Sequence, residues 1–341
     1  MVMSSGEPKN TTDLLLTGGA NRPFSGLLGE ANYTKHGVIA SISLQDSSFN
    51  ALKLFKPGKG GGASILPATD LTAASLQGDE LIVCSRTEVM IMQWPSLTLI
   101  KRIEHPWFND LHHAIRINGH IYVAATGVDA ILSFDSSGQL LSAEHAQALP
   151  LWHRRDPEVD YRQVASTKPH DSHPNFVFEL DGNIWVTRFE QRDAVNLSNQ
   201  DDRIDIGVER VHDGHVADGK IYFTSVNGCI IIADGATRKV EEVIDLNEID
   251  DRGRPLGWCR GLAIVGNLAY VGFSKLRSTK IEENLRWIKR RFGENKQLAE
   301  ALPARVGVYD LSTQRLLKEI ILPDEEMNTI FSIVPISLGS D

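Results

Sequence analysis

A short pattern recurs five times along the chain and constrains the fold more than any other feature. Each copy has a turn pair ending in glycine, followed by alternating β-branched and aromatic residues, at 77–83, 118–124, 181–187, 218–224 and 265–271. Such a turn leading into alternating residues is typical of a β-hairpin. Other short apolar segments stand before and after each copy. We therefore interpret the repeating unit as a four-stranded antiparallel meander.

The spacing of these units predicts the architecture. The turn glycines Gly78, Gly119, Gly182, Gly219 and Gly266 stand 41, 63, 37 and 47 residues apart, close to the ~40–50 residues of a propeller blade with room for insertions. A four-stranded sheet cannot bury both faces alone, whereas radial stacking of such sheets does so.

The two ends of the chain supply the strands of a sixth blade. Residues 328–336 read as a lone inner strand, while 13–19, 36–45 and 49–55 read as three strands lacking one. The sequence therefore predicts an all-β fold, a six-bladed β-propeller closed by N- and C-terminal strands, as a single domain over residues 1–341. A β-sandwich is the alternative.

Two insertions interrupt the strand pattern. Residues 146–171 are polar, contain proline and are too long for a hairpin loop, so we expect a rim or lid. The second insertion, 276–302, is predicted to hold a helix at about 279–293, because Thr279 and Glu282 form a capping-box pattern and Gly293 stands at the C-terminal cap. Its apolar stripe predicts that it covers a face of the ring or contacts a second subunit of a homo-oligomer.

Composition narrows the classes of partner. The formal net charge of −9 and the absence of a long basic cluster argue against nucleic acid or an anionic membrane. No apolar run approaches the ~20 residues of a membrane span, so we expect a cytoplasmic protein that binds a small molecule or another protein. Three widely spaced cysteines argue against a disulfide framework and a Cys-rich zinc site. We expect Cys259 to be packed in the core rather than activated as a thiolate.

Histidines recur at matching positions in successive blades. Counting back seven residues from each turn glycine, and including immediate neighbours, finds imidazoles within DLHHA (110–114), DSHPN (171–175) and HDGHV (212–216). Because the first strand of each propeller blade lines the central axis, we expect these side chains to meet at one end of it. A single axial histidine could instead be a hydrogen-bonded polar plug.

We predict a site from this register. The residues expected to be catalytic are His112, His173, His212 and Arg260. Those expected to bind substrate are Asp70, His113, Asn175, His215 and Trp258.

At these residues the chain resembles an uncharacterised family of bacterial propeller-like proteins classed as a domain of unknown function. The resemblance rests on DLHHA at 110–114, HPN at 173–175, VHDGH at 211–215 and RGLAIVGNLAYVGFSKLR at 260–277, and it spans residues 70–336. The chain carries His113 and His215 where the family pattern has Asp and Arg. The resemblance implies a propeller and a shared cluster of His112, His173, Asn175, His212 and Arg260, but no reaction.

The predicted cluster suits two chemistries. Three converging neutral imidazoles, His112, His173 and His212, could hold a divalent metal ion together with Asp70, Asp110 or Asp213. Without metal, histidine would move a proton while Arg260 holds an anionic group. No Gly-rich phosphate loop or nucleophile elbow is present.

Both chemistries predict an enzyme acting on a small polar, anionic metabolite, of the lyase, isomerase, cyclase or hydrolase type. The alternative is a non-catalytic binding scaffold for a small ligand or protein partner, with Trp107, Trp152 and Trp258 as an aromatic rim.

Overall fold

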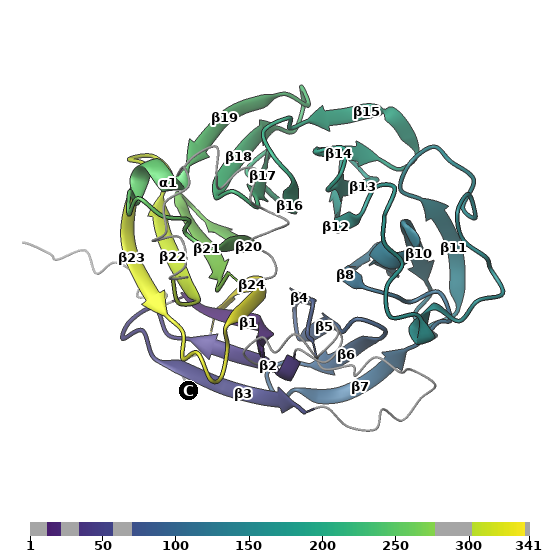
Figure 1. Ribbon diagram of the computed structural model, residues 1–341, viewed down its shortest axis with the longest axis horizontal. Helices are drawn as coiled ribbons and strands as arrows, with labels where there is room; N and C mark the ends of the chain where they lie inside the picture. Colours follow the sequence, from purple (N-terminus) through teal and green to yellow (C-terminus); the bar gives the residue numbers. More distant parts are fainter. Residues whose placement is uncertain (1–11, 22–33, 57–69, 277–301, 338–341) are drawn as a thin grey trace, which may run out of the picture.

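The computed structural model describes residues 12–21, 34–56, 70–276 and 302–337. The strands in these segments form six four-stranded antiparallel sheets arranged radially around a central axis (Figure 1). The prediction of a six-bladed β-propeller is confirmed. The helix predicted at about 279–293 lies outside the described residues. No helix within the described segments is long and apolar enough to cross a membrane.

The blades are numbered here in the order of their place around the ring, each from its inner to its outer strand. Blade 1 consists of β24 (Thr329–Ser337), β1 (Thr12–Asn21), β2 (Thr34–Ile42) and β3 (Phe49–Phe55). Blade 2 consists of β4 (Ala73–Gln77), β5 (Glu80–Cys84), β6 (Val89–Gln93) and β7 (Thr98–Ile103). Blade 3 consists of β8 (Leu111–Ile117), β9 (His120–Ala125), β10 (Ala130–Phe134) and β11 (Leu140–His145).

The remaining three blades follow the same order. Blade 4 consists of β12 (Pro174–Leu180), β13 (Asn183–Arg188), β14 (Asp193–Asn196) and β15 (Asn199–Asp205). Blade 5 consists of β16 (Val211–Ala217), β17 (Lys220–Ser225), β18 (Cys229–Asp234) and β19 (Val240–Asp245). Blade 6 consists of β20 (Trp258–Val265), β21 (Leu268–Ser274), β22 (Arg305–Asp310) and β23 (Arg315–Ile321). Short helical turns are η2 (Thr126–Val128), η3 (Tyr161–Gln163) and α1 (Leu246–Ile249).

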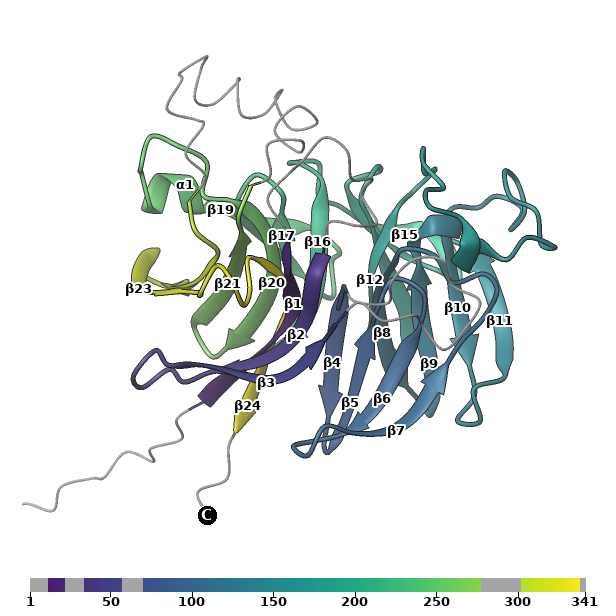
Figure 2. The same ribbon diagram turned by 60° about the horizontal axis from the view of Figure 1, so that its bottom comes forward.

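Blade 1 joins the two ends of the chain, as the sequence predicts. Strand β24 pairs antiparallel with β1, from Thr12 opposite Ser337 to Gly19 opposite Thr329. Figure 2 shows these two strands side by side, although they come from opposite ends of the sequence. The pairing closes the ring, because it covers an edge of β1 that would otherwise be open.

Local turn chemistry explains why the hairpins form. The turn pairs Asn118-Gly119, Asp181-Gly182 and Asp218-Gly219 all have positive φ at both residues. That is the backbone of a type I′ turn, whose twist matches the twist of the two strands it connects. The repeat found in the sequence is therefore a repeat of this turn.

Burial follows the position of a strand within its blade. The two middle strands of each blade lie between neighbouring blades and are buried on both faces over most of their length, as in β18. The outer strand β3 alternates between half-buried and exposed residues. The core consists of aliphatic and aromatic side chains packed between blades, such as Ile230, Leu262 and Phe273 between blades 5 and 6. Radial stacking thus replaces a single central core.

Closure of the ring can be tested at Ile333 of β24, which is 1% exposed and packs between blades 1 and 6. We expect Ile333→Ala to lower the free energy of unfolding by about 2–4 kcal/mol, because it leaves a cavity at the closing strand. The matched control is Ile321→Ala on β23, where the side chain is 61% exposed; it should change stability by less than about 0.5 kcal/mol. Urea unfolding measures both, and equal losses would contradict the importance of the closing strand.

Candidate functional site

The inner strands of five blades share a β-bulge near the start of the strand. Pairing registers shift around His112 in β8, Asn175 in β12, Asp213 in β16, Arg260 in β20 and Phe331 in β24. A bulge inserts an extra residue, bends the strand and turns a side chain in a new direction. In blades 3 to 6, the positions that lie at equal distances before the turn glycines in the sequence therefore fall at or next to these bulges, which form one layer around the axis.

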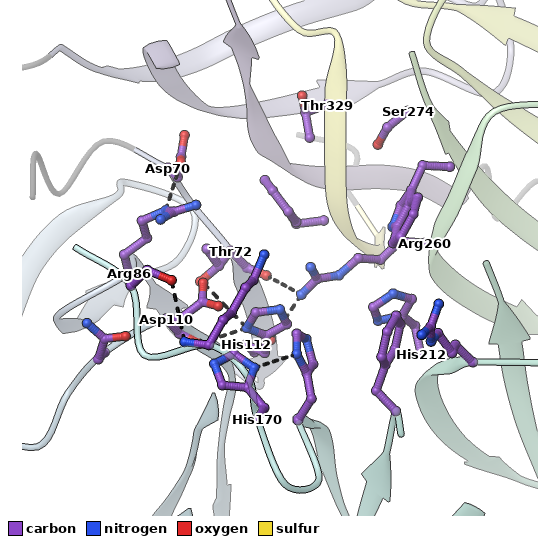
Figure 3. A pocket seen from close by; sticks show the side chains of 18 of the residues that line it. Asp70, Thr72, Arg86, Asp110, His112, His170, His212, Arg260, Ser274 and Thr329 are labelled. Carbon is purple, nitrogen blue, oxygen red and sulfur yellow. Dashed lines mark hydrogen bonds and ion pairs between the residues drawn. The ribbon is translucent and has the colours of Figure 1, made fainter. Parts of the chain in front are cut away.

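A pocket of about 890 Å³ lies where the inner strands begin, and all six blades contribute to its wall. Figure 3 shows the side chains that converge there. The segment between β11 and β12, which was predicted to be a rim, adds residues 165–170 to the wall. Asn109 holds this segment in place, because its side-chain amide donates hydrogen bonds to the carbonyl oxygens of Tyr161 and Val164, both at 2.8 Å.

The pocket brings together six of the nine predicted site residues: Asp70, His112, His173, His212, Trp258 and Arg260. The other three, His113, Asn175 and His215, do not line it. The Nδ1 atom of His113 accepts a hydrogen bond from the Val177 amide at 3.2 Å, and its ring stacks on Phe176 at 3.7 Å between ring centroids. His215 contacts the same phenyl ring, so these side chains form a separate layer.

Arg260 lies across the inner end of the pocket. Its Nη2 atom donates to the carbonyl oxygens of Thr72 at 3.0 Å and His112 at 3.4 Å, and its guanidinium lies over the Phe331 ring at 4.6 Å. The residue is 7% exposed and makes no direct ion pair within the described part of the chain, although the nearby carboxylates of Asp213 and Asp110 favour its charged form. Burial lowers the pKa of Arg260 to about 10, so the side chain remains charged near neutral pH.

His212 stands beside Arg260 in the same wall (Figure 3). It is 2% exposed, and neither ring nitrogen has a hydrogen-bond partner among the described residues. Its ring lies between Phe189 and Trp258, at centroid distances of 5.2 and 6.0 Å. Burial, the Arg260 charge and His112 hold the pKa of His212 well below its usual value. A buried neutral imidazole without partners keeps both a donor and an acceptor available for hydrogen bonding.

The proton on His112 is fixed by its backbone contact. The Nδ1 atom lies 2.7 Å from the carbonyl oxygen of Asp110, which can only accept a hydrogen bond. Nδ1 therefore carries the proton, and Nε2 has a lone pair. Burial lowers the pKa of His112 to about 4, although the Asp110 carboxylate partly opposes this. His112 is thus a neutral hydrogen-bond acceptor in the pocket.

His173 is coupled to a second histidine, His170. Their Nδ1 atoms lie 2.8 Å apart, and the Nε2 atom of His170 lies 3.2 Å from the Thr167 hydroxyl. Either His170 donates through Nδ1 and accepts from the Thr167 hydroxyl at Nε2, or His173 donates through Nδ1 and His170 donates to Thr167. The first arrangement leaves an N–H on Nε2 of His173 and the second leaves a lone pair there. The His173 ring also meets His112 edge to face at 4.9 Å. Burial and the neighbouring imidazoles hold the pKa of His173 well below its usual value.

Asp129 positions the loop that carries His170 and His173. It is 1% exposed, and its carboxylate accepts hydrogen bonds from the amides of Asp171, Ser172 and His173 at 2.8–2.9 Å and from the Ser172 hydroxyl at 3.2 Å. His173 itself has a φ of +54°, a strained backbone for a residue with a side chain. Asp129 therefore holds this loop in an otherwise unfavourable conformation.

Asp110 contributes negative charge to the outer part of the pocket. Burial alone would raise the pKa of its carboxyl, but His112, Arg86 and His173 outweigh burial and hold the pKa well below its usual range. Asp70 also lines the wall and forms an ion pair with Arg86 at 3.1 Å. The pocket therefore already contains carboxylates.

Asp213 lies just behind the pocket wall. Its carboxylate accepts hydrogen bonds from the Thr224 hydroxyl and from the Gly261 amide, the latter at 3.2 Å. Burial raises the pKa of Asp213 to about 6. Its hydrogen bonds join the bulges of blades 5 and 6, so its contacts are those of a structural link.

The described residues contain no group of three or more His, Cys, Asp or Glu placed to hold a metal ion. Phe189 separates His173 from His212, with centroid distances of 4.7 and 5.2 Å to the two imidazoles. This arrangement does not fit the predicted three-histidine ligand set. Burial raises the pKa of the Cys259 thiol well above its usual value, so a thiolate is also disfavoured.

Sequence reasoning missed several residues that shape the site. Asp129, Phe189 and Phe331 have no distinguishing motif, although Phe331 lies on the inner strand of blade 1. Of the three tryptophans considered as a rim, only Trp258 lines the pocket. Trp107 and Trp152 pack against each other and against the core of blades 2 and 3.

Comparison with known proteins supports the fold. No protein-family model matches the chain, and no curated protein matches it, so the resemblance to a domain of unknown function stays a prediction. A crystal structure of a protein of unknown function from Bacteroides caccae is similar, with a TM-score of 0.59 and 13% identity over 96% of this chain and 99% of that one. A candidate 6-phosphogluconolactonase from Bacteroides fragilis has a TM-score of 0.56 and 10% identity over 98% and 100%.

The role of Asp129 can be tested by Asp129→Asn. We expect this variant to lower the free energy of unfolding by about 1.5–3 kcal/mol, because an amide nitrogen cannot accept the hydrogen bonds that the carboxylate accepts. Hydrogen exchange should speed up at the amides of residues 171–173. Asp135→Asn, in an exposed turn of blade 3, is the matched control and should leave this exchange unchanged. Unchanged exchange in Asp129→Asn would contradict the positioning role.

The depressed pKa of His112 predicts how stability depends on pH. His112 has a pKa of about 4 in the folded protein and about 6.5 in the unfolded chain. Its contribution to the free energy of unfolding is therefore complete above pH 6.5 and is lost as the pH falls towards 4. Between about pH 7 and pH 5, His112 should account for roughly 2 kcal/mol of the loss. Urea unfolding at both pH values should show a smaller decrease for His112→Gln. An equal decrease in the wild-type protein and in His112→Gln would contradict the depressed pKa of His112.

Proposed function

We propose that the protein is an enzyme that transfers protons on a small polar, anionic metabolite bound in this pocket, without requiring a metal. The observation that carries the proposal is the pairing of Arg260, which has no ion-pair partner in the described chain, with His212, whose two ring nitrogens lack partners. A buried guanidinium without a direct ion pair and a buried imidazole without hydrogen bonds cost free energy. A ligand that supplies an anion and hydrogen-bonding groups would recover it.

The imidazoles divide into distinct roles in this proposal. Arg260 holds the anionic group at the inner end of the pocket, and His212 recognises the part of the substrate next to it. His112 presents a lone pair on Nε2 and would accept a proton. His173 is linked through His170 to the Thr167 hydroxyl, so it could return a proton along this chain. A bound anion would raise the pKa of His112 from about 4 towards neutrality, which makes it a better base when substrate is present.

The Bacteroides fragilis neighbour carries the name of a hydrolase of a phosphorylated lactone. That name belongs to a protein of 10% identity, and only the fold is shared at this distance. A lactone that opens to an acid is nevertheless one small anionic compound that belongs in a substrate screen.

The proposal is tested by activity profiling. Purified full-length protein would be incubated with a mixture of small anionic metabolites, including 6-phosphogluconolactone, and substrate loss and product gain followed by mass spectrometry. We expect one compound to be converted by the wild-type protein. In His112→Gln and Arg260→Met we expect conversion to fall by at least about 100-fold, the typical contribution of a general base or a charge contact.

The control is Lys220→Met, which alters an exposed ion pair on blade 5 far from the pocket lining and should retain wild-type conversion. Binding of a metabolite without turnover would overturn the enzymatic proposal and favour the binding scaffold. Turnover that survives in His112→Gln would overturn the role of that residue as base.

A further inference from the structure

The charged residues of the pocket wall indicate which kind of anion would bind there, a point that the proposed function leaves open. Other cations in the lining already have partners: Arg86 pairs with Asp70 at 3.1 Å, Arg210 with Glu190 at 3.7 Å and Lys275 with Asp324 at 2.8 Å. Lys168 also has contacts of its own. Arg260 therefore remains as the cation of the described lining that makes no direct ion pair, with the carboxylates of Asp213 and Asp110 acting on its charge only from a distance.

One guanidinium without a direct ion pair suits a ligand group with a single negative charge. A phosphate carries about −1.5 to −2 near neutral pH, which would leave negative charge uncompensated inside the pocket. Asp110, whose pKa is held low, adds to this repulsion. A carboxylate carries −1 and accepts hydrogen bonds in a plane, so it balances Arg260 without excess charge. The wall is therefore matched to a carboxylate rather than to a phosphate.

His212 adds a second requirement at the same place. A neutral imidazole has one N–H donor and one lone pair, and both nitrogens of His212 are buried and unpartnered. A carboxylate can accept from the N–H but cannot donate to the lone pair. A neighbouring hydroxyl group can donate, whereas an ammonium group would be repelled by the Arg260 guanidinium. The ligand should therefore carry a hydroxyl beside its carboxylate.

From these observations we propose that the pocket recognises 2-hydroxycarboxylates, with the carboxylate on Arg260 and the hydroxyl on His212. This inference rests on the proposed anion site and specifies the chemical class of its ligand. The aromatic rings of Phe189, Trp258 and Phe331 cover the neighbouring wall, so a larger carbon framework would pack there.

A matched set of small probes tests the inference with the full-length protein. Lactate carries both groups, propionate lacks the hydroxyl, 1,2-propanediol lacks the charge, and glycerol 3-phosphate replaces the carboxylate with phosphate. Dissociation constants would be measured by ligand-detected NMR titration, since fragments of this size bind weakly. We expect lactate, as one or both enantiomers, to bind about tenfold more tightly than propionate, the effect of one net hydrogen bond to a buried group. Propanediol and glycerol 3-phosphate should not bind measurably.

Two variants assign the groups of the ligand to their partners. Arg260→Met should abolish binding of lactate and propionate alike, because both depend on the charge. His212→Phe keeps an aromatic ring at this position but has no ring nitrogens, so binding of lactate should weaken to the level of propionate while binding of propionate is unchanged. Lys220→Met is again the control. Comparison of the four probes on the wild-type protein needs no variant and remains decisive if either substitution prevents folding.

Several results would overturn the inference. Tighter binding of glycerol 3-phosphate than of lactate would replace the carboxylate class with phosphate while leaving an anion site intact. Equal binding of lactate and propionate would remove the hydroxyl contact. Binding of none of the four probes would overturn the ligand class, and activity profiling would still decide separately whether the protein turns over another anion.

Discussion

Each sheet of this protein can bury both faces only if a neighbour stands on either side, so the structure depends on closing the ring. Strand β24 provides that closure by pairing with β1 and contacting the inner strands of blades 6 and 2. The interaction places an inner strand from the last part of the chain beside strands from the first. The same closure brings the beginnings of all six inner strands to one place, and the pocket lies there. Closure of the ring is therefore required both for the stability of the protein and for the formation of the site.

Within that ring, the bulges of the inner strands determine which side chains reach the site. A regular strand would alternate its side chains between the two faces of the blade. The bulges at His112, Arg260 and Phe331 break that alternation near the axis. As a result, the Arg260 guanidinium reaches two backbone carbonyl oxygens of other blades and lies over the Phe331 ring. Burying such a charge opposes folding by several kcal/mol unless hydrogen bonds and nearby charges compensate, and Arg260 has two backbone acceptors and the nearby carboxylates of Asp213 and Asp110 to do so.

The candidate site was predictable where it follows blade symmetry. His112, His173, His212 and Arg260 could be found because equivalent positions in stacked blades meet at the axis, and all four line the pocket. His113 and Asn175 could not be separated from them, because a shift of one residue in a strand moves a side chain to another face and a bulge leaves no clear trace in sequence. Asp129 was not identifiable, since the amides it binds are 42–44 residues further along the chain.

The amino-acid sequence by itself determined the number of blades and the way the ring closes, because hairpin turns and strand alternation are local and repeat along the chain. Only the tertiary structure decided which imidazoles face the pocket, which nitrogen of His112 carries its proton and which cation of the described lining makes no direct ion pair. These properties depend on distances between atoms of different blades, which are set by packing and by irregular backbone rather than by any neighbouring residue.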